Sequence, residues 1–137
     1  MPKKFSKYYA HSEDILLNKI GSPIKTAIVP DEGSNCLVVN GNLYVISIKH
    51  SLANPYYVAA FLESDAGADA LNSITTGGII GSVSIEELLK MKIPLPEKEI
   101  QDRVAKKYKD ILEETIELQK KFEATVQKRR NVFSNEI

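Results

Sequence analysis

The chain has 137 residues, a length that suits one domain with room for an appendage. Hydrophobic residues make up 43% and charged residues 26%, which are ordinary values for a folded globular chain and argue against disorder. Eighteen Lys and Arg residues balance eighteen Asp and Glu residues. A zero net charge gives no support to a general nucleic-acid or membrane-surface role, so any such role must depend on local patches.

The cysteine content and the lack of long apolar stretches limit the compartment. Cys36 is the only cysteine, so no intrachain disulfide can form and a reduced thiol is expected. The N-terminal stretch "MPKKFSKYYAHS" carries lysines but lacks the apolar core of a secretory signal. The uncharged stretch at 70–85 has 16 residues, too few and too polar to span a bilayer. We therefore expect a soluble, cytoplasmic protein.

Four short stretches before residue 50 predict strands. They are rich in Val, Ile, Leu and Tyr and cover residues 14–20, 25–30, 36–40 and 43–49. Gly, Pro, Asn and Ser between them supply turn chemistry. The pair Asn40-Gly41 stands between two apolar runs, which predicts a tight hairpin between the last two strands.

Residues 54–91 predict short helices with a glycine-rich loop among them. Asn54 and Pro55 suit the cap and the first position of a helix over "NPYYVAAFLES", and "ADALNSI" adds a further helical turn or two. "TTGGIIGS" predicts a loop. Ser84 and Glu87 have capping-box spacing at the start of another helix, "SIEELLKM".

A different pattern begins after Pro96. No Gly or Pro interrupts residues 97–131, and seam residues recur at spacings of four and three. Such heptad spacing predicts a helix of about 35 residues, roughly 50 Å long, which must project beyond a domain of about 95 residues. Pro94 and Pro96 keep the entry to this helix extended. The seam consists of Val104, Tyr108, Ile111, Thr115, Leu118, Phe122 and Thr125.

Two interpretations of this helix are open. Its first turns can pack back on the domain and leave the rest solvated, or its seam can meet another helix. In either case the expected fold class is α+β. A small mixed-sheet domain with short helices would cover residues 1–96, and a long C-terminal coiled-coil-like helix would cover residues 97–137.

The stretch "SVSIEELLKMKIPLPEKEIQDRVAKKY" resembles the C-terminal end of a target-recognition domain from type I restriction-modification DNA specificity subunits. "EDILLNKIGSPIKTAIVP", "NPYYVAAFLES" and "TTGGIIGSVS" resemble earlier segments of that family in the same order, so the likeness covers about residues 12–125. Glu13 stands where the family usually has Gly. The residues that carry the C-terminal likeness are Ser84, Ile93, Pro94, Leu95, Pro96 and Gln101.

The resemblance implies sequence-specific binding of double-stranded DNA without catalysis. Such subunits read a target and position an adenine methyltransferase subunit and a restriction subunit on it. A complete target-recognition domain has further strands before this segment, so residues 1–96 resemble a partial one. The helix after residue 96 resembles an assembly arm, which predicts a homodimer through Val104, Tyr108, Ile111, Leu118 and Phe122.

Two loops are candidates for DNA contact under this resemblance, because phosphates are bound by Lys, small hydroxyls and backbone N–H groups. The N-terminal "KKFSKYY" adds Lys3, Lys4 and Lys7, and Ser73 lies before the second loop. The predicted DNA-binding residues are Asn18, Lys19, Ser22 and Lys25 in the first loop and Thr75 and Thr76 in the second.

No motif predicts catalysis, a metal or a cofactor. "NPYY" resembles the Asn-Pro-Pro-Tyr/Phe motif of adenine methyltransferases, but it lacks the second Pro and opens a helix, so Tyr56 and Tyr57 are predicted core residues. "GGIIG" lacks the Lys-Ser/Thr end of a phosphate loop, and His11 and His50 are isolated. Two hypotheses remain, a DNA-recognition module and an interaction module that has lost DNA reading.

Overall fold

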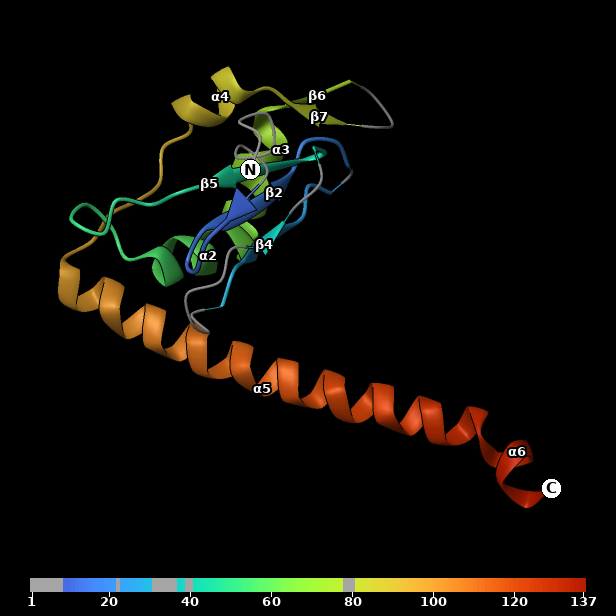
Figure 1. The fold of residues 1–137 in the computed structure, drawn as a ribbon. Coiled ribbons are helices and arrows are strands. Elements are labelled where there is room, and N and C mark those ends of the chain that lie inside the picture. Colours follow the sequence, from blue (N-terminus) through green and yellow to red (C-terminus); the bar gives the residue numbers. More distant parts are fainter. Residues whose placement is uncertain (1–8, 22, 31–36, 39–40, 78–80) are drawn as a thin grey trace.

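A computed structural model describes residues 9–21, 23–30, 37–38, 41–77 and 81–137. The described part consists of a small α+β domain and a long helix that extends well past it (Figure 1). The predicted fold class is therefore confirmed, and the strand pairs within the described residues are antiparallel.

Three strands form the central sheet in the order β3-β2-β5: β2 (Ile15–Asn18), β3 (Thr26–Ile28) and β5 (Leu43–Ile46). Ile15 and Leu17 are fully buried on one face of β2, while Leu16 packs on the other face against Ala10 and Val29. Because both faces are covered, β2 is a continuous apolar run rather than an alternating one.

Two short strand pairs flank this sheet, β1 (Tyr9–Ala10) with β4 (Leu37–Val38) and β6 (Thr75–Thr76) with β7 (Ser82–Val83). Among the described residues, β4 pairs with β1 and β5 pairs with β2, so the predicted hairpin between these two segments is not formed there. Asn40 itself lies outside the described residues. The apolar runs do form strands, but each of these strands pairs with a segment far away in the sequence.

Helix α2 (Pro55–Glu63) covers the inner face of the sheet. It begins as predicted, because the Asn54 side chain accepts a hydrogen bond from the Tyr56 N–H and Pro55 occupies the first turn. Tyr56 and Tyr57 are buried, which confirms them as core residues. Ser64 then caps helix α3 (Asp65–Ser73).

Helix α4 (Ile85–Lys90) is short and begins at its predicted cap. The Ser84 Oγ accepts a hydrogen bond from the Glu87 N–H at 3.2 Å. Leu88 points into the core cluster, whereas Ile85 and Leu89 are exposed. Residues 91–97 then run without regular structure to the long helix.

Helix α5 (Lys98–Arg130) docks only its first turns on the domain and is followed by the short helix α6 (Val132–Glu136). Gln101 and Ala105 are buried against the domain, and Tyr108 and Leu112 pack on the core cluster that includes α2. Beyond these turns α5 leaves the domain (Figure 1). The first interpretation is therefore right for these turns, while Ile111, Leu118 and Phe122 on another side of α5 are exposed.

Hydrogen bonds at the junction hold the direction of α5. Gln101 is only 6% exposed; its Oε1 accepts from the Asn54 N–H at 3.1 Å and its Nε2 donates to the Pro96 carbonyl at 2.9 Å. The Tyr57 hydroxyl donates to the Pro94 carbonyl oxygen. The Gln101 side chain thus links the start of α2 to the proline segment, and these bonds fix the direction of α5 relative to the domain.

Gln101→Ala is expected to lower the free energy of unfolding by about 1–3 kcal/mol, because it leaves the Asn54 N–H without its acceptor. Urea denaturation measures the loss. Gln119→Ala is the matched control, since Gln119 is exposed on the same helix and its replacement should change stability by no more than about 0.5 kcal/mol. Equal losses in the two variants would contradict this role of Gln101.

Candidate nucleic-acid interface

The two loops predicted from sequence lie side by side. The Gly21 N–H donates to the Gly81 carbonyl oxygen at 2.9 Å, and the Val83 N–H donates to the Lys19 carbonyl oxygen at 2.9 Å. Ile20 and Ser82 form an antiparallel bridge between these bonds. We call residues 18–25 and 75–83 together the loop pair. Its β6–β7 hairpin lies on the opposite side of the domain from α5 (Figure 1).

In the first loop, backbone groups build the turn and two lysines project from it. The Asn18 N–H donates to the Lys25 carbonyl, which closes the turn at 3.1 Å. The Lys19 Nζ lies 5.1 Å from the centroid of the Tyr44 ring, and the Lys25 side chain is exposed. Ser22, also predicted to bind DNA, lies outside the described residues.

In the second loop, the two predicted threonines differ in what their side chains do. The Thr75 Oγ1 donates to the Leu71 carbonyl at 2.6 Å, so this hydroxyl proton is used in a hydrogen bond to the last turn of α3. Thr76 is exposed. Ser73 donates to the Ala70 carbonyl in the same local manner. Thr76 is therefore the threonine whose side chain is open to a ligand.

Tyr44 supports the loop pair and was not predicted from sequence. Its hydroxyl donates to the Val83 carbonyl at 2.8 Å, and its ring lies beside the Lys19 ammonium. The apolar run at 43–49 predicts a strand that contains Tyr44, and an aromatic residue is ordinary in a strand. Only the approach of residues 81–83 to the sheet gives it this second role.

Gly81 lets the two loops approach. A Cβ at this position would lie 2.3 Å from the Thr75 Cγ2 and 3.1 Å from the Gly21 carbonyl oxygen. Any side chain here would therefore force the loops apart.

Gly81→Ala is expected to destabilise the chain by about 1–3 kcal/mol through overpacking. Adding Thr75→Ser removes the nearer methyl group while keeping the hydroxyl, so the double variant should recover part of the loss. Thermal or urea unfolding of the two single variants and the double variant measures the coupling. Simple additivity of the two single effects would contradict this packing.

The loop pair is positively charged in a chain whose net charge is zero. Lys19 and Lys25 lie in residues 18–25, and no Asp or Glu occurs in 18–25 or 75–83. The exposed side chains of Thr76 and Ser82 add hydroxyl groups to the two lysines. This is the chemistry that binds phosphate oxygens.

The described residues contain no group of three or more His, Cys, Asp or Glu side chains placed to hold a metal ion. In the same part of the chain, none of the helices is both long enough and apolar enough to cross a bilayer.

Residues 1–128 match the family described as the type I restriction modification DNA specificity domain. The chain belongs to this family. No curated protein matched it. Membership supports a DNA-specificity role for this chain, and specificity domains act with DNA and with a restriction-modification complex.

The predicted helix interface of this specificity domain divides in two. Tyr108 is half-buried against the domain, and burial together with a hydrogen bond to Glu63 raises the pKa of its phenol. Ile111, Leu118 and Phe122 are 62%, 58% and 68% exposed. We call Ile100, Val104, Ile111, Leu118 and Phe122 the exposed stripe of α5, since each is exposed and they share one side of the helix.

The exposed stripe is distinct from the docking side of α5. At 3.6 residues per turn, it lies about a quarter turn around the helix from Gln101, Ala105 and Leu112. Docking on the domain therefore leaves the stripe open along the length of α5.

Proposed function

We propose that this chain is the DNA-recognition module of a type I restriction-modification specificity subunit. The observation that carries the proposal is the joining of two distant loops, through the Gly21–Gly81 and Lys19–Val83 hydrogen bonds, into one positively charged surface. Membership in the specificity family supports the same role. The predicted contacts are Asn18, Lys19, Ser22, Lys25 and Thr76 by side chain, with Thr75 acting through the backbone of its strand.

In this role the chain is non-catalytic and works in the cytoplasm. It would position an adenine methyltransferase subunit and a restriction subunit on DNA, while their own active sites carry out the chemistry. The arm α5 leaves the domain on the side opposite the β6–β7 hairpin (Figure 1). DNA and protein partners can therefore bind at the same time without competing for one surface.

We further propose that α5 pairs with α5 of a second copy in an antiparallel homodimer. The exposed stripe motivates this proposal, because five large apolar residues on one helix face otherwise remain in water. An antiparallel pair would carry the two domains at opposite ends of a helical spacer.

A second candidate function is an interaction module that dimerises or docks a partner without reading DNA. The exposed stripe and the balanced charge of the whole chain favour it. The two candidates differ in whether the loop pair has a ligand.

Fluorescence polarisation with random-sequence duplex DNA at low salt distinguishes them, with and without the cognate methyltransferase subunit. The DNA-recognition role predicts saturable binding that weakens as salt rises, with the complex binding more tightly than the chain alone. Absence of binding in both arms would reject this role and leave the interaction module.

A further inference from the structure

The open edge of the central sheet lies along β5. Among the residues that the structure describes, the order β3-β2-β5 leaves β5 with a strand on one side only. The Lys19 N–H donates to the Asn42 carbonyl at 3.0 Å, next to the register pair 18 and 43. In an antiparallel ladder the bonded pairs alternate, so Tyr44 and Ile46 bond to β2 while Val45 turns its N–H and C=O outward.

The other side of β2 agrees with this assignment. The Asn18 N–H donates to the Lys25 carbonyl and the Val29 N–H to the Asp14 carbonyl, so the even-numbered residues of β2 bond toward β3. The odd-numbered residues are left for β5. Within the described residues, the outward N–H and C=O of Val45 have no backbone hydrogen-bond partner. Such an edge is a template for another strand.

An apolar groove runs beside this edge. A cavity of about 300 Å³ lies between β5 and the segment that contains α4, and its walls are almost entirely aliphatic. Leu89 of α4 is 78% exposed beside it. Unpaired backbone and apolar pockets together are what strand addition requires, since the ladder gives affinity and the pockets select alternate side chains. The lining includes Val45, Ile46, Ile48, Leu88, Leu89 and Met91.

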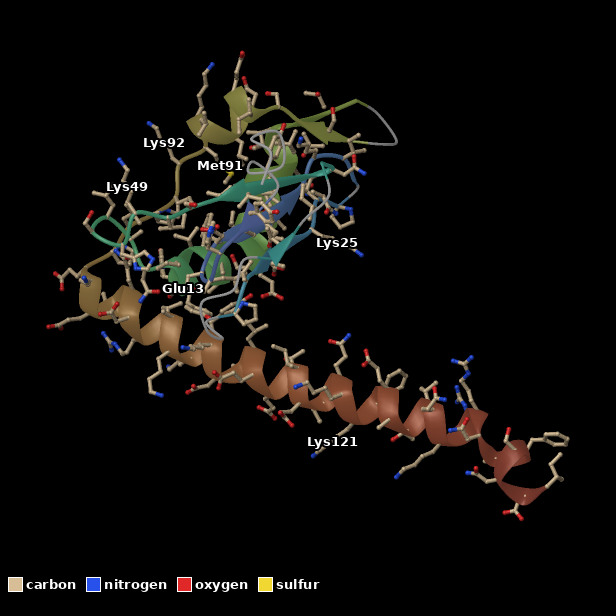
Figure 2. The ribbon with its side chains drawn as sticks, viewed as in Figure 1. Glu13, Lys25, Lys49, Met91, Lys92 and Lys121 are labelled. Carbon is tan, nitrogen blue, oxygen red and sulfur yellow. The ribbon has the colours of Figure 1, made fainter. Side chains whose placement is uncertain are left out.

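One end of the groove is basic. Lys49 follows the lining residue Ile48, and Lys92 stands between the lining residues Met91 and Ile93. Figure 2 shows the side chains of Lys49 and Lys92 leaving the domain on the same side, while Met91 turns toward its interior. Within the described residues neither lysine has a salt bridge. A ligand with carboxylates at this end of the groove would form ion pairs with the two lysines.

We propose that the β5 edge binds an extended segment of a partner protein as an added strand, with alternate apolar side chains in the groove and acidic residues beside Lys49 and Lys92. A second copy of β5 fits less well, because residues 37–48 contain no Asp or Glu to place beside these two lysines. This surface is separate from the loop pair and from the exposed stripe of α5.

Three labelled ten-residue peptides test the proposal on the full chain by fluorescence polarisation. The acidic probe alternates Val and Thr and ends in two Asp residues. The basic probe ends in two Lys residues instead, and the proline probe replaces two Thr residues with Pro. The acidic probe should bind saturably, and each of the others should bind about tenfold more weakly or worse, since it loses charge pairing or ladder hydrogen bonds.

Val45→Pro removes the outward N–H without removing a hydrogen bond to β2. Edge strands tolerate Pro at positions whose N–H faces outward, as Val45 does. This variant should weaken binding of the acidic probe about tenfold, while Val45→Ala, which keeps the N–H and trims only one wall of the groove, should weaken binding clearly less than Val45→Pro does. Leu89→Asp provides a second test at an exposed position if Val45→Pro does not fold. Binding that neither Val45→Pro nor Leu89→Asp weakens would overturn the proposal.

Amide hydrogen exchange on the wild-type chain gives an independent reading. The acidic probe should slow exchange at Val45 and leave Tyr44 and Ile46, already bonded to β2, nearly unchanged. The proposal would be overturned if the acidic probe did not bind up to about 1 mM, which is well above the micromolar range of specific recognition. It would also be overturned if the wild type formed a dimer that Val45→Pro dissociates, because the edge would then bind a second copy.

Discussion

Replacing Ile111 and Leu118 together with Asp is expected to abolish self-association of the isolated chain while leaving the small domain folded. Both side chains are exposed and lie about a quarter turn around α5 from the residues that contact the domain. Burying one large apolar side chain stabilises by roughly 1.5–3 kcal/mol. Five such residues on each helix can therefore outweigh an association cost of about 4–15 kcal/mol.

Light scattering at several concentrations measures the effect, and circular dichroism checks the fold. Lys120→Asp with Gln127→Asp is the matched control, because these exposed residues have the same seven-residue spacing on the opposite face of α5. The control should remain dimeric. A wild-type chain that stays monomeric up to the millimolar range would reject the homodimer and leave a foreign helix as the partner of the stripe.

The direction of pairing depends on the residues that flank the seam. Glu114 and Lys121 each precede a seam residue, Thr115 and Phe122. In an antiparallel pair, Glu114 of each copy can lie beside Lys121 of the other, whereas in a parallel pair it faces an uncharged flank. Glu114→Lys or Lys121→Glu alone should thus weaken the dimer several-fold at low salt, and the two together should restore it. A double variant no tighter than either single one would argue against antiparallel pairing.

Replacing Lys19 and Lys25 together with Ala is expected to weaken DNA binding by the assembled complex on every sequence. The slope of log affinity against log salt should become shallower by about 0.9 for each phosphate that is no longer neutralised by a lysine. Lys25 is exposed, and the Lys19 ammonium lies beside the Tyr44 ring at the edge of the loop pair. Their positions suit contact with the DNA backbone, which carries affinity rather than base selection.

Lys49→Ala with Lys92→Ala is the control for this experiment, because it removes the same charge from a different side of the domain. Figure 2 shows Lys25 on the side of the domain away from Lys49 and Lys92. The control should keep the wild-type salt slope. If the Lys19 and Lys25 variant also kept it, the loop pair would not be the phosphate-binding surface.

The local signals in the sequence predicted the helices well, because they act within a few residues. Asn54 with Pro55, and Ser84 with the Glu87 amide, start α2 and α4 where the caps indicated. The absence of Gly and Pro after Pro96, together with the heptad spacing, predicted α5 almost to its ends. Cap bonds and helical periodicity need no information from distant segments.

The strands were predicted as segments but not as a sheet. Residues 14–20 contain β2, yet the ladder ends at Asn18, and Ile20 pairs with Ser82 on another strand pair. β4 found β1 rather than β5. Pairing is decided by contacts far apart in sequence, which an apolar run does not specify. The backbone at Glu13 is a further case, with φ of 67°, a conformation that suits the Gly usual at that position in the resemblance.

For the candidate site, residue types define which groups can be bound, whereas the arrangement of those residues depends on contacts between distant segments. The lysines, threonines and glycines of both loops can be read directly, because residue type defines what each can bind. That the loops touch, that Thr75 is bonded to α3 while Thr76 is open, and that Tyr44 supports Lys19 and Val83 follow only from the fold. In α5 the seam was visible as periodicity. The position of α2 decides that Tyr108 packs against the domain while the exposed stripe does not. The sequence shows that a helix face is apolar, but it does not show which partner covers that face.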